Sequence, residues 1–290
     1  MALTGRNEAY YSDYLGSAQE LLSAVKWGYL YQGQRYRWQG KRRGTPTFGL
    51  PPAAFVNCIQ NHDQVANSAF GRRIHELTSP GRYRAMTALM LLAPGTPMLF
   101  QGQEFASSAP FLFFADHKPE LADLVCKGRA EFVSQFPSVA SKEVMERLPN
   151  PCIDETFLRC KLDFSERESH AEAYALHRDL LRLRREEAAF RAQRPRGLDG
   201  AVLGDEAFVL RFFGDDPHED RLVLVNLGRD LHCFPSPEPL LAPPRGSGWR
   251  VRWSSEHPRY GGQGTASVEG EDGFTIPGHA TVVLAPAEET

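Results

Sequence analysis

Residues 55–67 read FVNCIQNHDQVAN, a stretch that changes from apolar to polar at its middle. Residues 53–59 follow a Pro-Pro pair and form a short apolar run, which predicts a buried strand. The polar residues that come next, Asn61 to Gln64, carry amide, imidazole and carboxylate groups that can hold a substrate hydroxyl. The sequence therefore predicts a strand whose end carries a candidate site.

A second strand with a polar end follows after a predicted helix. A serine N-cap followed by proline opens the predicted helix 79–92, and Gly95 is expected in a left-handed cap just past its end. Residues 96–100 form another apolar strand, and residues 101–104 after it are polar. This succession is typical of a parallel α/β fold, in which the carboxyl ends of neighbouring strands meet at one rim. We therefore expect the two polar ends to lie side by side, the alternative being two ordinary polar loops.

The flanking segments extend this α/β part. A capping box and helical apolar spacing predict a helix over residues 17–31, and the Gly- and Pro-rich residues 33–52 predict a long loop. Residues 170–185 form an amphipathic helix. Its core-facing side chains are expected to be Ala173, Leu176, Leu180, Leu181 and Leu183.

The character of the chain changes near residue 198. From there on, short β-type runs are separated by Gly, Pro and Asp, with no helical stretch between them. These runs are residues 207–213, 222–225, 249–253, 273–276 and 281–285. The sequence thus predicts an α/β part over residues 1–197 and an all-β sandwich over residues 198–290.

Composition limits the function classes. The 290-residue chain has 42% hydrophobic residues and a formal charge of -3, which argues against a general polyanion binder. Its one basic cluster, residues 35–43, alternates with aromatics but is short enough to be a solvated loop. Five scattered cysteines without C-x-x-C spacing suggest neither a disulfide framework nor a zinc site. With no visible export signal or membrane-spanning segment, we expect a cytoplasmic protein that binds neither nucleic acid nor membrane.

Four motifs carry a resemblance to a known family. HDQVAN and GTPMLFQGQEF stand at the two polar ends, PFLFFADHKPEL follows them, and SSEHPRYGG lies in the β part. In this order they resemble the α-amylase superfamily of glycoside hydrolases and, within it, the family of malto-oligosyltrehalose trehalohydrolases. The resemblance covers most of the chain.

The resemblance implies a fold, an activity and a set of site residues. The fold would be the C-terminal part of a (β/α)8 barrel followed by a β-sandwich, and the reaction would be hydrolysis of the α-1,4 bond that joins trehalose to a maltodextrin. Asp63 matches the family's transition-state-stabilising carboxylate, and an oxocarbenium-like transition state explains why a carboxylate is needed there. The substrate-binding residues would be His62, Gln64, Asn67, Asn61, Gln103 and Glu104. No metal and no cofactor is implied, and the substrate would be malto-oligosyltrehalose or a maltodextrin.

Two further carboxylates are expected to be missing. A retaining glycosidase needs a nucleophile and a general acid about 5 Å apart. In the family they lie upstream of the NHD segment, and residues 1–54 contain no matching strand ends. We therefore expect an incomplete, inactive fragment with exposed strand edges and poor solubility in isolation.

Several alternatives stay open at this stage. The His62–Asp63 pair could be a structural hydrogen-bonded pair, and Asp63 with Glu104 could form a catalytic pair on their own. Phe111, Phe113, Phe114 and Tyr36 could offer apolar faces to sugar rings. At the level of function, the rivals are a branching-type glycosyl transferase and a non-catalytic glucan-binding protein.

Overall fold

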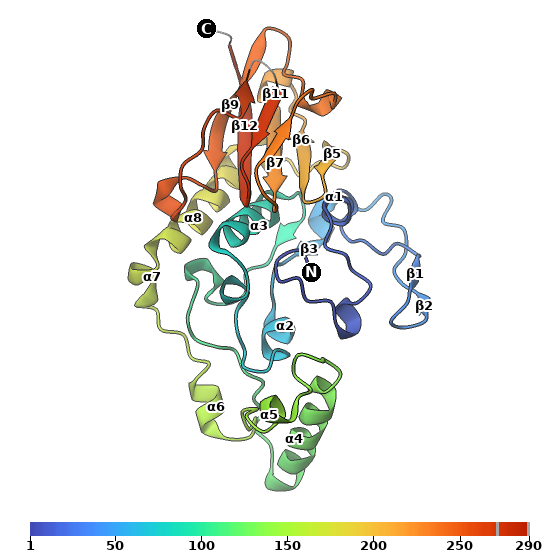
Figure 1. Cartoon of the computed structure of the whole chain (residues 1–290), viewed down its shortest axis with the longest axis vertical. Helices are drawn as coiled ribbons and strands as arrows, with labels where there is room; N and C mark the ends of the chain where they lie inside the picture. Colours follow the sequence, from blue (N-terminus) through green and yellow to red (C-terminus); the bar gives the residue numbers. More distant parts are fainter. Residues whose placement is uncertain (271–272, 289–290) are drawn as a thin grey trace.

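The computed structural model describes residues 1–270 and 273–288, and it is elongated (Figure 1). An all-β unit forms one end, an α/β part lies in the middle, and a small helical extension forms the other end. The extension consists of α4 (Pro119–Val133), α5 (Lys142–Met145) and α6 (Asp154–Leu158). In the described part of the chain, no helix is long and apolar enough to cross a membrane.

The α/β part contains the predicted parallel strand pair. β3 (Val56–Asn57) and β4 (Thr96–Pro97) run parallel, with Val56 opposite Thr96. The strands are shorter than predicted, because a 3-10 turn, η2 (Pro52–Ala54), occupies the start of the first run and Pro97 has no N–H to donate. The expected burial is also wrong for the first strand, since Val56 is 61% exposed on the open side of β3.

Helix α3 (Pro80–Leu92) connects the two strands, as the sequence predicts. The Ser79 hydroxyl accepts a hydrogen bond from the backbone N–H of Arg82, which caps the helix. The predicted left-handed cap at Gly95 is wrong. The helix ends at Ala93 in an extended conformation, and a Cβ on Gly95 would lie 2.3 Å from the Asn57 amide nitrogen. Glycine is required at position 95 for this close approach and not for a helix cap.

Two other helices differ from the prediction in their details. α1 (Ala18–Trp27) ends four residues early, because Gly28 has φ +89° and packs against the Phe55 ring. α8 (Ala171–Glu186) has the expected bounds, but Leu181 is 40% exposed and does not face the core. The other helical segments of the described chain are α2 (His62–Ala66), α7 (Glu166–Ser169) and α9 (Ala188–Arg191), with 3-10 turns η1 (Ala9–Tyr11), η3 (Ile74–Glu76), η4 (Gln103–Phe105), η5 (Pro217–Glu219), η6 (Pro239–Leu241) and η7 (Pro258–Tyr260).

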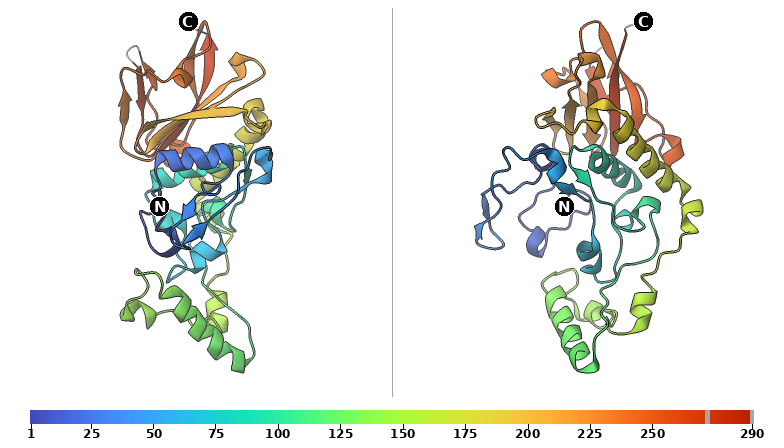
Figure 2. Two further views of the ribbon diagram at one scale, coloured as in Figure 1. Left: turned by 90° about the vertical axis from the view of Figure 1, so that its right-hand side faces the viewer. Right: turned by 180° about the vertical axis from the view of Figure 1, so that it is seen from behind.

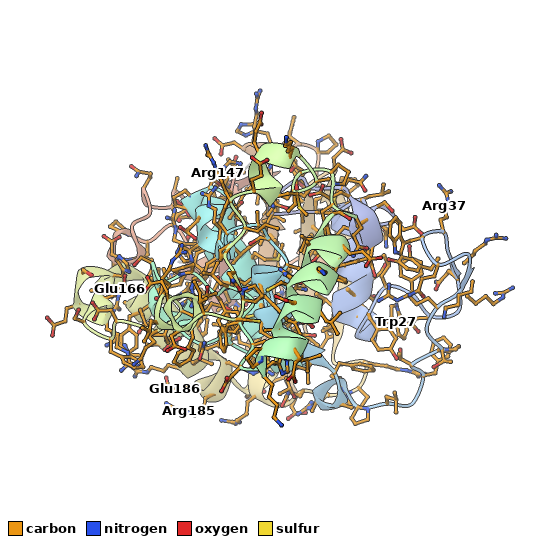
Figure 3. The ribbon with its side chains drawn as sticks, turned by 90° about the horizontal axis from the view of Figure 1, so that it is seen from below. Trp27, Arg37, Arg147, Glu166, Arg185 and Glu186 are labelled. Carbon is orange, nitrogen blue, oxygen red and sulfur yellow. The ribbon has the colours of Figure 1, made fainter. Side chains whose placement is uncertain are left out.

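The basic cluster forms an exposed hairpin of β1 (Arg35–Tyr36) and β2 (Lys41–Arg42). The Arg43 guanidinium stacks over the Tyr36 ring at 4.6 Å. Seen from below, Arg37 projects away from the body on the side opposite Glu166, and α4 lies nearest the viewer (Figure 3). The hairpin has the form of a solvated loop.

The C-terminal part is the predicted β-sandwich. One sheet has the order β5-β6-β7-β12-β9 and the other the order β10-β11-β8. The strands are β5 (Leu198–Gly204), β6 (Ala207–Phe212), β7 (Arg221–Asn226), β8 (Leu231–Cys233), β9 (Ser247–Ser254), β10 (Glu269–Gly270), β11 (Gly273–Ile276) and β12 (Ala280–Glu288). Five of these match the predicted runs, whereas β5, β8 and β10 are not predicted. Apolar side chains such as Leu224 and Ile276 form the core between the sheets.

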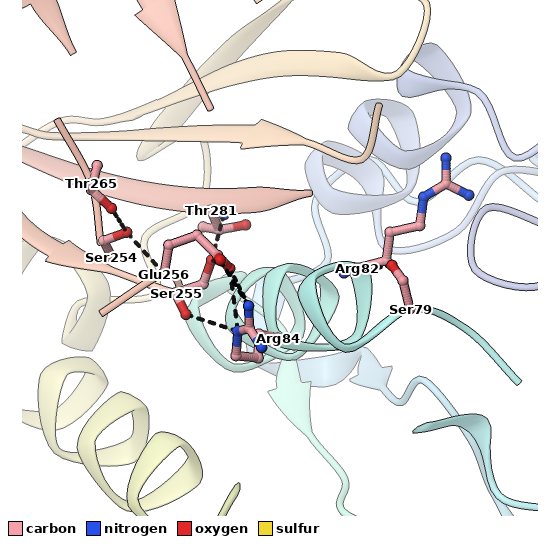
Figure 4. A network of polar contacts seen from close by, with 8 residues as sticks. All are labelled: Ser79, Arg82, Arg84, Ser254, Ser255, Glu256, Thr265 and Thr281. Atoms are coloured by element: carbon pink, nitrogen blue, oxygen red, sulfur yellow. Dashed lines mark hydrogen bonds and ion pairs between the residues drawn. The ribbon is translucent and has the colours of Figure 1, made fainter. Parts of the chain in front are cut away.

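A continuous apolar core joins the sandwich to the α/β part. Helices α1 and α3 lie against the five-stranded sheet (Figure 2), and α8 packs on α3. Leu91, Leu180 and Phe208 are fully buried in this core. A polar network reinforces the junction (Figure 4). In it the Arg84 guanidinium donates to the Glu256 carboxylate at 2.7 Å. The division of the chain at residue 198 stays a prediction, although β5 begins there.

Candidate functional site

The candidate site is built on α2, the short helix that follows β3. The Asn61 side chain accepts from the Gln64 N–H at 3.1 Å, and the Gln64 side chain accepts from the Asn61 N–H at 2.9 Å. This reciprocal capping box starts the helix. Both residues were predicted to bind substrate, but in this structure their side-chain oxygens hold the helix terminus.

The capped terminus presents His62 and Asp63 to solvent. The His62 Nε2 and Asp63 Oδ1 atoms are 3.4 Å apart, and the two side chains are 67% and 71% exposed. The structure therefore does not support an interior ion pair for these residues. Asp63 keeps most of its carboxylate free to accept hydrogen bonds from a ligand.

His62 and Asp63 line a hollow of about 600 Å³. Asn67 and Arg129 also line it, and its remaining walls are mostly apolar and come from the segment after β4 and from α4. They include Phe111, Phe113, Phe114, Val125 and Phe132. An acidic edge beside aromatic faces suits a neutral polyol ligand, whose hydroxyls bind the carboxylate while its C–H faces pack on the rings.

Arg129, on α4, ties the far wall of the hollow to α2. Its guanidinium donates to the Asn67 side-chain oxygen at 2.6 Å and to the Ala66 carbonyl, and it stacks 4.9 Å from the Phe113 ring centroid. Burial lowers the pKa of Arg129 from its ordinary value. Asn67, a predicted substrate-binding residue, is thus held by a protein partner. Sequence reasoning did not identify Arg129, because 62 residues separate it from Asn67 and no motif marks it.

The two polar strand ends do lie side by side, as predicted. The Gln60 side-chain amide donates to the Gln103 side-chain oxygen at 3.5 Å, which links the end of β3 to the end of β4. Gln103 is completely buried, and its side-chain oxygen also accepts from the Phe100 N–H. The structure therefore contradicts a direct substrate contact for Gln103, whose side chain fills the space beneath the rim.

Glu104 points elsewhere as well. Its carboxylate lies 3.6 Å from the Arg167 guanidinium, and its side chain is 27% exposed. Glu104 is not among the residues that line the hollow beside Asp63. The alternative in which Asp63 and Glu104 act as a catalytic pair gains no support from this arrangement.

A buried arginine fixes the segment that directly precedes Phe111, Phe113 and Phe114 of the aromatic wall. Arg73 is fully buried and donates to the carbonyls of Ala109 and Gln101 at 2.6 and 2.7 Å. Burial lowers the pKa of Arg73. Because removing a buried donor leaves both carbonyls unpaired, Arg73 holds the segment 101–109 in place. The sequence gives no sign of this role, since an arginine in a loop is usually solvated.

Two tyrosines near the N-terminal part of the chain, Tyr36 and Tyr11, differ in their relation to the candidate site. Tyr36, one of the aromatic residues that could have offered a face to a sugar ring, is fully buried and donates to the Tyr10 carbonyl, so this alternative is not supported. Tyr11 lines a second cavity together with Gln64 and Asn67. Burial, a hydrogen bond with Tyr10 and the nearby charge of Asp63 raise the pKa of Tyr11. Tyr11 thus belongs to the surroundings of Asp63.

Nothing in residues 1–270 and 273–288 indicates a metal site, since no group of three or more His, Cys, Asp or Glu side chains lies close enough to hold an ion. The polar groups that line the hollow are the Asp63 carboxylate, the His62 imidazole, the Asn67 amide and the Arg129 guanidinium.

Comparison with known proteins gives three consistent results. A family described as a domain of unknown function (DUF3459) matches residues 195–288. Malto-oligosyltrehalose trehalohydrolase of Deinococcus radiodurans is 39% identical over 237 residues, which are 80% of this chain and 38% of that protein. The protein of the same name from Brevibacterium helvolum is 37% identical over 191 residues, 64% of this chain and 31% of its own length.

The fold is also similar to a solved structure. A protein proposed to be an α-amylase, from Salmonella typhimurium, superimposes with a TM-score of 0.77 and 27% sequence identity. The alignment covers 98% of this chain and 44% of that protein. The α/β fold class followed by an all-β sandwich is thereby confirmed.

These findings confirm the resemblance stated from the motifs. The chain is related to the α-amylase family of glycoside hydrolases. Its particular relatives are malto-oligosyltrehalose trehalohydrolases, of which it matches the C-terminal portion. The chain spans less than two fifths of the length of these two curated relatives.

Proposed function

We propose that this chain is the C-terminal portion of a glycoside hydrolase that releases trehalose from malto-oligosyltrehalose, with β3 and β4 as the last strands of a (β/α)8 barrel. The names of the relatives support the reaction, and the parallel β3–α3–β4 unit supports the barrel. Residues 1–197 would contribute to the barrel and residues 198–290 would form the sandwich domain. The proposed setting is cytoplasmic, without cofactor, nucleic acid or membrane partner.

The observation that carries the proposal is the position of Asp63. Its carboxylate is 71% exposed at the edge of the aromatic hollow, where a sugar ring can reach it. In the proposed reaction Asp63 accepts hydrogen bonds from ring hydroxyls, and these bonds strengthen as the ring distorts toward the oxocarbenium-like transition state. His62 holds a neighbouring hydroxyl, while Asn61, Gln64 and Asn67 keep α2 and its partner helix in place.

The nucleophile and the general acid are proposed to come from residues that this chain does not contain. Stabilising a transition state has no effect where no group attacks, so the isolated chain is expected to bind substrate without turnover. The aromatic wall and Arg129 would then define the part of the hollow that accepts the substrate.

A chimera tests this proposal. The matching segment of the Deinococcus radiodurans relative is replaced by the present chain, and trehalose release from malto-oligosyltrehalose is measured. We expect activity in the chimera, and we expect Asp63→Asn to lower kcat by about 10²–10³-fold with little change in KM, since the lost interaction is made mainly in the transition state.

Asp205→Asn is the matched control, because Asp205 is an exposed aspartate in the turn between β5 and β6. It should leave kcat unchanged. New α-1,6 branches in place of trehalose would favour the branching-type transferase. Maltodextrin binding without turnover in the chimera would favour the non-catalytic glucan-binding protein, and an unchanged kcat in Asp63→Asn would refute the role of Asp63.

A further inference from the structure

Two of the five cysteines lie close together in the helical extension, although their spacing in the chain does not indicate a pair. Cys126 lies on α4 and Cys152 lies in the turn before α6, 26 residues later. Their Sγ atoms are 3.9 Å apart, and both side chains are partly exposed. Cys160 differs from them, since it is buried and its thiol donates to the Thr156 carbonyl at 3.2 Å.

Hydrogen bonds with the Asn150 side chain and with the backbone of α4 hold the two cysteines in position. The Asn150 side-chain oxygen accepts from the Cys126 thiol at 3.4 Å and from the Cys152 N–H at 2.9 Å. The Cys152 thiol donates to the Ala122 carbonyl of α4 at 3.7 Å. In addition, the Ala115 N–H donates to the Pro151 carbonyl at 2.8 Å, which ties the turn to the segment before α4.

A disulfide bond is about 2.05 Å long, so the two sulfurs need to approach each other by roughly 2 Å. Rotation about the two Cα–Cβ bonds moves each sulfur by that order, because a thiol swings between staggered rotamers. Bond formation removes both thiol hydrogens, and with them the thiol hydrogen bonds to Asn150 and Ala122. The hydrogen bonds from the Cys152 N–H to Asn150 and from the Ala115 N–H to Pro151 can persist. The Sγ–Sγ separation of 3.9 Å is thus within the range that side-chain rotation can close.

We propose that Cys126 and Cys152 form a reversible dithiol–disulfide pair, which is oxidised by a low-molecular-weight disulfide such as oxidised glutathione. One protein thiolate attacks a glutathione sulfur, the glutathione S–S bond breaks, and a mixed disulfide forms with release of one glutathione thiol. The second protein thiolate then attacks the mixed disulfide. The protein loses two electrons and two protons, which leave on two molecules of reduced glutathione.

The pair has a structural consequence for the candidate site. Cys126 lies one helical turn before Arg129, whose guanidinium binds Asn67 and the Ala66 carbonyl of α2. A disulfide at Cys126 would fix α4 to the turn at residues 149–153 and so restrict the wall of the hollow beside Asp63. The effect on glucan binding rests on the proposed function, whereas the thiol chemistry is independent of it.

The test measures thiols in the full 290-residue chain. Burial, the Cys152 thiol and the Asp123 charge raise the pKa of Cys126, so exchange is run at a pH of about 8.5, where more thiolate is present. After incubation with oxidised glutathione and its removal, the denatured protein should contain three free thiols instead of five. Mass spectrometry of a digest should show the Cys126 and Cys152 peptides joined, and reduction should restore all five thiols.

Cys233→Ser is the matched control and should retain the linked peptides, whereas Cys126→Ser and Cys152→Ser should each abolish them. Circular dichroism of each variant confirms that it is folded. The proposal is overturned by five remaining thiols, by a stable glutathione adduct on either cysteine, or by equal pairing among all five cysteines after oxidation of the folded protein. A separate measurement tests the proposed restraint on α4. Oxidation should slow amide hydrogen exchange in that helix by about tenfold, and an unchanged exchange rate would contradict the restraint.

Discussion

Two acidic side chains in this chain differ in burial and pairing. The comparison distinguishes a carboxylate that stabilises the fold from one that is available to bind a ligand. Glu256, at the junction with the sandwich, lies 2.7 Å from the Arg84 guanidinium, and both side chains are 12% exposed. Asp63, on α2, lies 3.4 Å from His62, and both side chains are more than two thirds exposed. The Glu256 carboxylate accepts hydrogen bonds from within the protein, whereas the Asp63 carboxylate remains available to a ligand.

The difference follows from the elements that carry the two residues. Glu256 follows β9 and packs on α3, whose surface is almost entirely covered by the sandwich and by α8. Asp63 lies in the first turn of a five-residue helix that has only its C-terminal side buried. A buried charge has to be paired, but an exposed charge does not. Substitutions in the two regions should therefore have different consequences.

The largest effect on stability is expected at the junction. Arg84→Ala leaves the Glu256 carboxylate nearly buried without its partner and should lower the free energy of unfolding by about 3 kcal/mol. Urea unfolding followed by circular dichroism measures the change. Arg182→Ala, which removes an exposed i,i+4 pair with Glu186, should cost only about 0.3–0.5 kcal/mol. Equal decreases in the free energy of unfolding of the two variants would contradict the expected difference between a buried and an exposed ion pair.

An intermediate effect is expected from pH at His75, which lies in η3 between the two regions. Burial lowers the pKa of His75 from 6.5 to about 4, and its Nδ1 atom is buried without a hydrogen-bond partner among the described residues. The unfolded chain thus binds a proton more readily than the folded chain between these two values. The stability that neutral His75 contributes is present above pH 6.5 and is lost progressively as the pH falls toward 4.

We expect a decrease of about 2 kcal/mol at pH 5 relative to pH 7 from this residue. His75→Gln cannot take up a proton, so its stability curve should be flatter than that of the parent chain between pH 6.5 and 4. Urea unfolding across this range measures both curves. Parallel curves would show that His75 titrates normally in the folded protein.

The smallest effect on stability is expected on α2. Asp63→Asn changes an exposed side chain and should alter the free energy of unfolding by less than about 0.5 kcal/mol. The same urea unfolding measures it. A loss near that of Arg84→Ala would mean that Asp63 has a structural partner and is not held free for a ligand. Together with the chimera, this variant separates a binding role from a structural one.

Much of the fold could be predicted because it depends on local patterns. The serine cap and proline of α3, the helical spacing of α8 and five of the eight strands of the sandwich follow directly from residue order. The short strands β5, β8 and β10 were missed because their glycines and polar residues resemble loops. Gly95 was misread because its cause, the close approach of Asn57, lies 38 positions away in the chain.

In the candidate site, too, some features depend on local residue order and others on contacts between distant residues. The motif around His62 and Asp63 indicated an exposed carboxylate at a strand end, and residue order alone was sufficient for that. Which neighbours share the hollow was decided by the tertiary structure. The buried Gln103 side chain contacts Gln60, whereas Arg129 and Phe132 line the hollow from α4 and Phe111, Phe113 and Phe114 line it from the segment after β4.

The sequence by itself determined α3, α8 and five strands of the sandwich, and its motifs indicated the class of protein and Asp63 as the residue for the proposed chemistry, because these depend on side chains close together in the chain. Only the tertiary structure decided which polar side chains are accessible to a ligand and which form capping or buried hydrogen bonds. It also decided that Cys126 and Cys152 lie close together. The physical reason is that burial and pairing depend on contacts between residues far apart in sequence, and one-dimensional spacing carries no record of them.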